Sequence, residues 1–220
     1  MNLEQILERI QNARISAGIW ENVRLIAVSK NVDVDAVENL YSQGQIEFGE
    51  NRVQEMKRKC EILSDLPLKW HFIGSLQSNK INHLLSLRPA LWQSCNSLEL
   101  AVAVDKRLNY TLDTLLEINS ADESSKSGIE ISRAVDEFLK IKENCKNLNL
   151  CGVMSIGAHS DDLGEIQKSF ETTYKIFENL RPHGAKICSM GMSDDYKVAV
   201  AEGATHIRLG RVLFNQDRNK

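Results

Sequence analysis

Residues 24–48 read RLIAVSKNVDVDAVENLYSQGQIEF and contain the repeating pattern from which the fold can be predicted. Its first part, Arg24–Val28, is a short apolar and β-branched run that predicts a buried strand. Apolar side chains then recur at helical spacing over Val34–Tyr41, and a second short apolar run follows at Gln45–Phe48. A strand, a helix and another strand in this order predict a parallel βαβ unit.

The same alternation continues to the end of the chain. Helical spacing returns over Ile129–Cys145 and Ile166–Leu180, and apolar residues within positions 3–10 predict an extra helix before the first strand. Eight strands alternating with helices predict an α/β fold, a single (β/α)8 TIM barrel, which usually takes ~250 residues and rarely fewer than ~200. The six further strands are expected at Trp70–Ile73, Ala90–Ser94, Thr114–Ile118, Leu150–Ile156, Lys186–Cys188 and His206–Leu209.

A doubly wound open sheet is the structural alternative to the barrel. Such a sheet often carries a glycine-rich turn after its first strand. Here the first strand ends instead in Ser29-Lys30-Asn31, without a glycine. The barrel is therefore preferred, and residues 1–220 are expected to form one domain.

Composition excludes several classes of protein. The 220 residues include 27 Lys and Arg against 30 Asp and Glu, a net charge of −3, which lacks the basic excess of a nucleic-acid-binding protein. No stretch approaches the ~20 apolar residues of a membrane span, and the N-terminus lacks the apolar run of a signal peptide. We therefore expect a cytoplasmic protein with no membrane partner. The five cysteines and five histidines show no metal-ligand spacing, so reduced thiols and no metal are expected.

In such a barrel the active site lies at the C-terminal ends of the strands, so residues that follow strands are candidates. Lys30 follows the first strand, and its stem is expected to enter the barrel mouth among apolar walls. There a lowered pKa would free its amine for a Schiff base. The alternative is a lysine that reaches solvent at a strand end. By contrast, Lys57-Arg58-Lys59 is interpreted as a solvated helix face.

Two glycine-bearing turns follow the last two strands. Ser189–Asp195 (SMGMSDD) offers a serine hydroxyl and backbone N–H groups to an anion, and Arg208–Arg211 (RLGR) ends the last strand. Barrels frequently hold phosphate between these two loops. A lysine and a phosphate site at one barrel mouth fit either pyridoxal phosphate or the substrate of a sugar-phosphate aldolase.

Seven segments, in order over nearly the whole chain, resemble the pyridoxal phosphate homeostasis protein family, one-domain relatives of the N-terminal domain of alanine racemase. WHFIGSLQSNK and SMGMSDD are specific to that family. The resemblance implies a barrel of fold type III that binds pyridoxal 5′-phosphate. The segments are IAVSK (Ile26–Lys30), FGENRVQE (Phe48–Glu55), WHFIGSLQSNK (Trp70–Lys80), NSADESSKSG (Asn119–Gly128), GVMSIG (Gly152–Gly157), CSMGMSDD (Cys188–Asp195) and IRLGRVLF (Ile207–Phe214).

The resemblance implies a role for each matching residue. Lys30 corresponds to the lysine that forms the internal aldimine, and Arg208 corresponds to the arginine that faces the pyridine nitrogen. Lys126 matches a family segment and is predicted either to guide the cofactor or to be a solvated loop lysine. The remaining positions are the phosphate-binding Ser193, Gly210 and the backbone of Arg211, and the pocket-lining Asn51.

The resemblance also implies a function in pyridoxal phosphate homeostasis without a dedicated catalytic activity. A permanently charged arginine cannot accept the pyridine proton, which leaves the cofactor a weak electron sink. The chain is expected to lack the second domain that racemases use for catalysis. The expected partners are pyridoxal phosphate and pyridoxal-dependent apo-enzymes, and the expected state is a monomer. A slow amino-acid racemase is the alternative.

Overall fold

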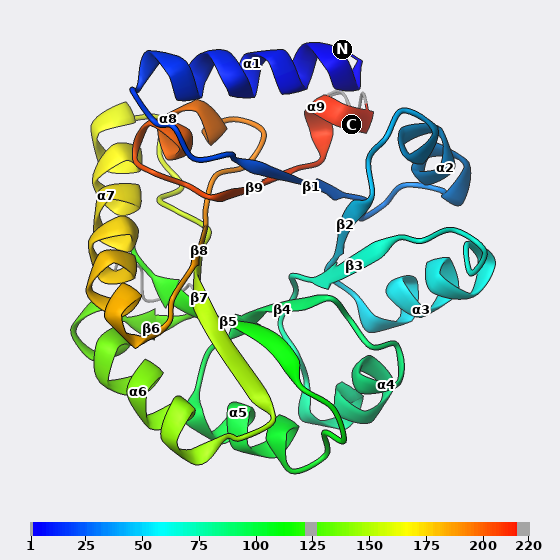
Figure 1. Ribbon diagram of the computed structural model, residues 1–220, viewed down its shortest axis with the longest axis vertical. Coiled ribbons are helices and arrows are strands. Elements are labelled where there is room, and N and C mark those ends of the chain that lie inside the picture. The colour runs from blue at the N-terminus through cyan, green and yellow to red at the C-terminus, as the bar shows by residue number, and fades with distance from the viewer. Residues whose placement is uncertain (1, 122–126, 215–220) are drawn as a thin grey trace.

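Eight parallel strands form a closed barrel in the computed structural model, which describes residues 2–121 and 127–214 (Figure 1). Each strand pairs with the next along the chain, and the last pairs with the first, which closes the ring. The predicted (β/α)8 fold is thus confirmed. The strands are β1 (Arg24–Val28), β2 (Glu47–Glu50), β3 (Lys69–Phe72), β4 (Leu91–Cys95), β5 (Leu112–Asn119), β7 (Leu148–Ser155), β8 (Ile187–Ser189) and β9 (His206–Leu209).

Helices surround the ring of strands (Figure 1). The predicted N-terminal helix is present as α1 (Leu3–Ser16), which packs beside α8 (Tyr196–Ala201). It begins with a capping box, because Asn2 Oδ1 accepts from the Gln5 N–H and Gln5 Oε1 accepts from the Asn2 N–H. The others are α2 (Val34–Ser42), α3 (Val53–Ile62), α4 (Ile81–Ser86), α5 (Leu98–Asp105), α6 (Ala134–Asn144), α7 (Leu163–Leu180) and α9 (Arg211–Phe214), with 3-10 turns at Ser78–Lys80, Ile131–Arg133 and Arg181–His183.

The predicted elements differ from the observed ones mainly at their ends. Six strands are shifted or extended by one or two residues. The largest error is the predicted helix Ile129–Cys145, which starts only at Ala134. Its first residues form a short strand, β6 (Ile129–Glu130), because Ile129 pairs with Ile118 on β5 and is buried there. Tertiary pairing therefore overrides the helical spacing of this segment.

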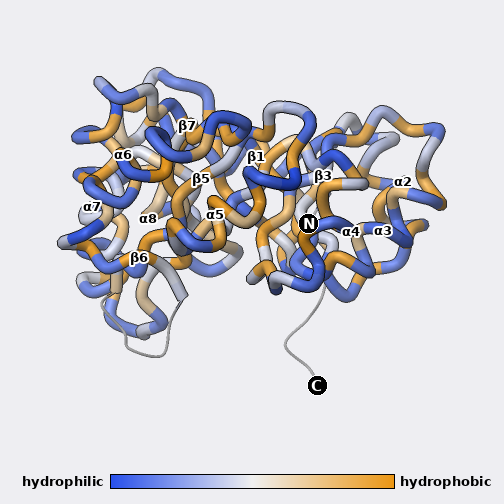
Figure 2. The backbone as a smooth tube through the Cα atoms, turned by 90° about the horizontal axis from the view of Figure 1, so that it is seen from below, coloured by the Kyte–Doolittle hydropathy of each residue, from blue (hydrophilic) through white to orange (hydrophobic). Residues whose placement is uncertain are grey.

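The side chains of the strands are divided between two layers. One set faces the helices, where the main apolar core lies. The helices contribute one apolar face each, so apolar and polar positions alternate along them (Figure 2). The other set faces the barrel interior, where a small apolar cluster of Leu91, Leu115, Cys151 and Met154 lies. This alternation decides which strand residues can reach a ligand at the barrel mouth.

Within the described ranges, no helix is long and apolar enough to cross a membrane. The same residues contain no group of three or more His, Cys, Asp or Glu side chains that could hold a metal ion. All five cysteines are free thiols. Burial raises the pKa of the Cys60 thiol to about 12, so it is a weak nucleophile.

Candidate functional site at the C-terminal end of the barrel

Four adjacent strands carry the residues predicted from the sequence. The order around the ring is β8, β9, β1 and β2, and parallel strands present their C-terminal ends at the same side of the barrel. The structure therefore brings the predicted residues to one end of the molecule. Lys30 follows β1, Asn51 follows β2, Ser193 follows β8, Arg208 lies in β9, and Gly210 and Arg211 follow β9.

Lys30 lies in a turn that is tied to the neighbouring strand. The N–H of Ser29 donates to the carbonyl of Gly49 on β2 (3.0 Å), and the N–H of Val32 donates back to the carbonyl of Ser29 (3.1 Å). Asn31 has a φ of 59°, a left-handed conformation that asparagine tolerates. The Lys30 side chain is exposed rather than enclosed by apolar walls as predicted. Its amine is therefore accessible to a ligand that arrives from the barrel mouth.

Asn51 is held by a close backbone approach. A Cβ on Gly74 would lie 2.0 Å from the Asn51 carbonyl oxygen, so only glycine fits at position 74. The carbonyl of Gly74 in turn accepts a hydrogen bond from the Ser94 hydroxyl (2.6 Å). The backbone segments that follow β2 and β3 are thus in close contact, and the second is hydrogen-bonded to β4. The Asn51 side chain at this point is exposed.

The loops after β8 and β9 meet at a pair of small polar groups. The Gly210 N–H donates to the Ser193 hydroxyl over 3.4 Å, a long contact that leaves both groups capable of binding an anion. Gly210 lies against β1, since a Cβ there would be 3.1 Å from the Val28 carbonyl oxygen. The Arg211 guanidinium forms an ion pair with Asp194, so its side chain ties the loops together. This leaves its backbone for the predicted phosphate site.

Arg208 is buried inside the barrel, with 4% of its surface exposed. Its guanidinium donates to the Ser189 hydroxyl and to the Ser155 carbonyl, both over 2.7 Å. Burial lowers the pKa of Arg208 to about 10, while the carboxylates of Asp195 and Glu117 oppose that shift. Arg208 is therefore a cation at neutral pH, and its direct hydrogen-bond partners are neutral groups.

A chain of hydrogen bonds continues from Arg208 across the barrel. The Ser189 hydroxyl donates to Gln93 Oε1 (2.7 Å), and Gln93 Nε2 lies 3.0 Å from His71 Nδ1. Because β4 and β8 are not neighbours in the ring, the contact between Gln93 and Ser189 crosses the interior. Burial lowers the pKa of His71 to about 3, so its imidazole is neutral. This series of hydrogen bonds holds the Arg208 guanidinium on one side.

Glu117 on β5 is the acidic member of this layer. Ser127 donates to its Oε2 (3.1 Å), and Asn96 donates to the Ser127 hydroxyl (3.1 Å). Burial raises the pKa of Glu117, while the Ser127 hydrogen bond and the Arg208 charge oppose the shift. The sequence interpretation missed Glu117, Gln93 and His71. Each is a polar or charged side chain buried within a strand, and that placement is the signal that could have identified it.

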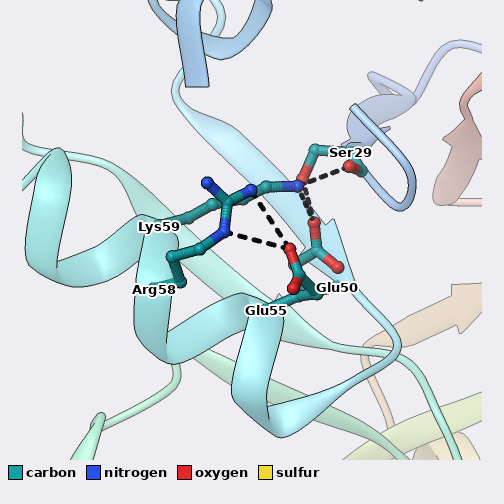
Figure 3. A network of polar contacts seen from close by, with 5 residues as sticks. All are labelled: Ser29, Glu50, Glu55, Arg58 and Lys59. Carbon is teal, nitrogen blue, oxygen red and sulfur yellow. Dashed lines mark hydrogen bonds and ion pairs between the residues drawn. The ribbon is translucent and has the colours of Figure 1, made fainter. Parts of the chain in front are cut away.

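Lys59 contradicts the interpretation of Lys57-Arg58-Lys59 as a solvated face. Lys57 and Arg58 are exposed and pair with carboxylates on their own helix. Lys59 is fully buried between α3 and the strands, where its amine meets Glu50 (Figure 3). The physical reason is helical spacing, since Lys59 lies on the same buried face of α3 as Val53 and Met56. Lys126 lies outside the described residues.

Comparison with known proteins defines the class of this barrel. The family described as alanine racemase, N-terminal domain, matches residues 1–217. A pyridoxal phosphate homeostasis protein of Helicobacter pylori is 46% identical over 97% of this chain and 97% of its own. The human protein of that name is 36% identical, over 88% of this chain and 76% of its own. The chain belongs to the pyridoxal phosphate homeostasis protein family.

Solved structures agree with this assignment. PipY of Synechococcus elongatus with PLP bound has a TM-score of 0.81 and 33% identity, covering 95% of this chain and 99% of that one. A structure described as an unknown protein from Bifidobacterium adolescentis has a TM-score of 0.88 and 30% identity, covering 96% of this chain and 92% of that one. An alanine racemase of Clostridium difficile, 16% identical with a TM-score of 0.72, covers all of this chain and 58% of its own. That last likeness shows the shared fold alone.

Proposed function

We propose that this protein binds pyridoxal 5′-phosphate at the C-terminal end of the barrel, attaches it covalently to Lys30 and serves pyridoxal phosphate homeostasis. The related PipY binds PLP at 33% sequence identity, which supports the choice of cofactor. The single observation that carries the proposal is the approach of Gly210 to Val28, two residues before Lys30. It supports the proposal because the loop with the proposed phosphate-binding amide of Gly210 lies close to the turn with the exposed Lys30.

The residues present fit the cofactor chemically. Gly210 and Ser193 offer an N–H and a hydroxyl that are only weakly paired with each other, and the absence of a Cβ at position 210 keeps the amide open. Together with the backbone of Arg211, they are the proposed phosphate donors. The exposed Asn51 is the proposed pocket-lining residue after β2. The small side chain of Ser193 and the missing side chain of Gly210 allow a dianionic group to approach the main chain.

The buried Arg208 within the barrel supports a role without a dedicated catalytic activity. When bound, pyridoxal phosphate supplies an aldehyde that condenses reversibly with a primary amine, with loss of water. Arg208 is the proposed partner of the pyridine nitrogen, and as a cation with a pKa of about 10 it cannot take up a proton at neutral pH. It therefore favours an unprotonated ring, which stabilises a carbanion poorly. We propose reversible storage and release of the cofactor rather than amino-acid turnover.

The proposal extends to the setting in which the protein acts. We propose that residues 1–220 act as one cofactor-binding domain, as a monomer in the cytoplasm. Pyridoxal-dependent apo-enzymes are the proposed recipients of the released cofactor. Mixing the loaded protein with such an apo-enzyme, and following the activity that the apo-enzyme gains, tests this part.

The central test is covalent trapping. The protein loaded with pyridoxal 5′-phosphate is expected to show an absorption band of the Lys30 adduct, and borohydride reduction followed by peptide mapping is expected to place the label on Lys30. The Lys30→Ala variant should lose both signals. Lys106→Ala, a change of another exposed lysine at the opposite end of the barrel, should retain them. A label on any other lysine in the wild-type protein would overturn the assignment.

Chiral assays over a panel of amino acids decide between storage and racemisation. We expect turnover no faster than that of free pyridoxal phosphate. A rate well above the free cofactor, and lost in Lys30→Ala, would favour the slow racemase instead.

A further inference from the structure

A buried polar network of Ser29, Glu50 and Lys59 connects the ends of β1 and β2 to α3 (Figure 3). The Lys59 amine donates to the Ser29 carbonyl and to Glu50 Oε1, both over 2.6 Å. The Ser29 hydroxyl donates to the same Glu50 oxygen over 2.7 Å. All three residues are fully buried, so these contacts hold without competition from water.

The network acts on the backbone next to two residues of the proposed site. Successive residues of an extended strand point to opposite faces. Ser29 and Glu50 point outward to Lys59 on α3, and each is followed in the chain by a candidate site residue, Lys30 or Asn51. The carbonyl that accepts from Lys59 belongs to the peptide bond between Ser29 and Lys30. Lys59 thus joins the C-terminal ends of β1 and β2 at a single point.

Stability alone does not account for a charge pair at this position. Taking two charges out of water is unfavourable, and well-packed apolar residues of similar volume often serve as well or better. The pair is also incompletely satisfied, because Glu50 Oε2 is buried without a hydrogen-bond partner. Apolar side chains would fill the space, but they could not donate to the Ser29 carbonyl. The hydrogen bond to the main chain is therefore a contribution that the Lys59 amine makes and an apolar side chain could not.

We propose that Lys59 and Glu50 are positioning residues for cofactor attachment. Lys59 fixes the peptide bond that precedes Lys30, and Glu50 neutralises Lys59 while anchoring the end of β2 before Asn51. The exposed Lys30 amine is thereby presented toward the phosphate loop at Gly210 from a rigid base. This inference rests on the proposed function, because it concerns the covalent step at Lys30.

The experiment compares a cofactor that can react with one that cannot. Pyridoxine 5′-phosphate has the same ring and phosphate as pyridoxal 5′-phosphate, but an alcohol replaces the aldehyde. The test variant is Glu50→Met/Lys59→Met, which replaces the buried pair by apolar side chains of similar length and preserves the packing. The matched control is Lys57→Met, the same change at an exposed position of α3.

The double variant is expected to bind pyridoxine 5′-phosphate as the wild type does. Its affinity for pyridoxal 5′-phosphate should fall about tenfold, because the attachment step must then order the Lys30 turn. The covalently trapped fraction at limiting cofactor should fall with it. Without any cofactor, the amides of residues 29–32 should exchange hydrogen faster than in Lys57→Met.

The outcomes separate the positioning role from the proposed function. An equal loss of affinity for both compounds, or no loss for either, would overturn the positioning role. Unchanged amide exchange at residues 29–32 would overturn it as well. A wild-type protein that binds pyridoxine 5′-phosphate but traps no pyridoxal 5′-phosphate on Lys30 would overturn the proposed attachment itself. A selective loss for the aldehyde, with Lys57→Met unchanged, supports both.

Discussion

Arg208 and Lys59 are both buried cations, and they lie on opposite sides of the barrel wall. Arg208 is 4% exposed and faces the interior, where its guanidinium donates to a hydroxyl and a carbonyl. Lys59 is 0% exposed and lies in the outer layer, where its amine meets the Glu50 carboxylate. One cation is held by neutral partners, and the other is paired with an opposite charge at 2.6 Å.

Because Lys59 has a charged partner and Arg208 has neutral hydrogen-bond partners, we expect the two cations to have different roles. The charge of Lys59 is neutralised within the protein, so its value lies in the geometry that it imposes on β1 and β2. The carboxylates of Asp195 and Glu117 interact with the charge of Arg208 but are not its hydrogen-bond partners. Arg208 is therefore the cation that we propose acts on a ligand at the barrel mouth. Four measurements test how far this contrast holds.

Removing the Lys59 amine should have the largest effect on stability. Lys59→Met leaves the Glu50 carboxylate buried without its cation, and the free energy of unfolding is expected to fall by about 4 kcal/mol. Urea denaturation followed by circular dichroism measures this. The control Lys57→Met should stay within about 0.5 kcal/mol of the wild type. A loss in Lys59→Met no larger than that of the control would contradict the role of the pair.

Removing the Arg208 guanidinium should have a smaller effect. Arg208→Met loses two hydrogen bonds from a charged donor, and the free energy of unfolding is expected to fall by about 3 kcal/mol. The loss is smaller than for Lys59→Met because the groups left behind, the Ser189 hydroxyl and the Ser155 carbonyl, carry no charge. Arg58→Met, which breaks an exposed ion pair with Glu55, is the matched control. A larger loss of stability in Arg208→Met than in Lys59→Met would contradict this difference between the two cations.

Acid should act on the inner layer through its histidines. Burial lowers the pKa of His71 from 6.5 to about 3 and that of His206 to about 4. Below about pH 6.5 the unfolded chain therefore binds protons that the folded protein does not. The free energy of unfolding consequently decreases as the pH is lowered. Between pH 7 and pH 5 each histidine should account for about 2 kcal/mol of this loss.

The variant His71→Asn isolates this contribution. Its free energy of unfolding should fall about 2 kcal/mol less than that of the wild type between pH 7 and pH 5, since one histidine no longer titrates. Urea denaturation at both pH values gives the two differences. An identical decrease in the free energy of unfolding in both proteins would mean that, between pH 7 and pH 5, His71 binds a proton as readily in the folded protein as in the unfolded chain.

Replacing both partners of the outer pair should have the smallest effect. Glu50→Met/Lys59→Met leaves no unpaired charge, and its free energy of unfolding is expected to lie within about 1 kcal/mol of the wild type. A double-mutant cycle with Glu50→Met and Lys59→Met alone then gives the coupling of the pair. A double variant as unstable as Lys59→Met would show that the destabilisation does not come from the unpaired carboxylate.

The sequence predicted the barrel and its extra helix because both depend on local patterns. Short apolar runs and helical spacing are properties of neighbouring residues, and the parallel arrangement follows from their order. The same argument placed Lys30, Ser193 and Gly210 at strand ends, and the strand order brings them to one side of the barrel. The prediction failed at Ile129–Glu130, where pairing with β5 replaced the expected helix.

Sequence patterns alone were therefore enough to predict the fold and the end of the barrel that carries the candidate site. Which polar residues contact one another depends on the three-dimensional packing. Gln93 and Ser189 are 96 positions apart and touch only because the closed ring brings β4 and β8 face to face. Lys59 looked like one of three surface cations, and the packing of α3 on the sheet buried it against Glu50. Local periodicity fixes which face a residue occupies, but its partner on that face is set by the closure of the whole barrel.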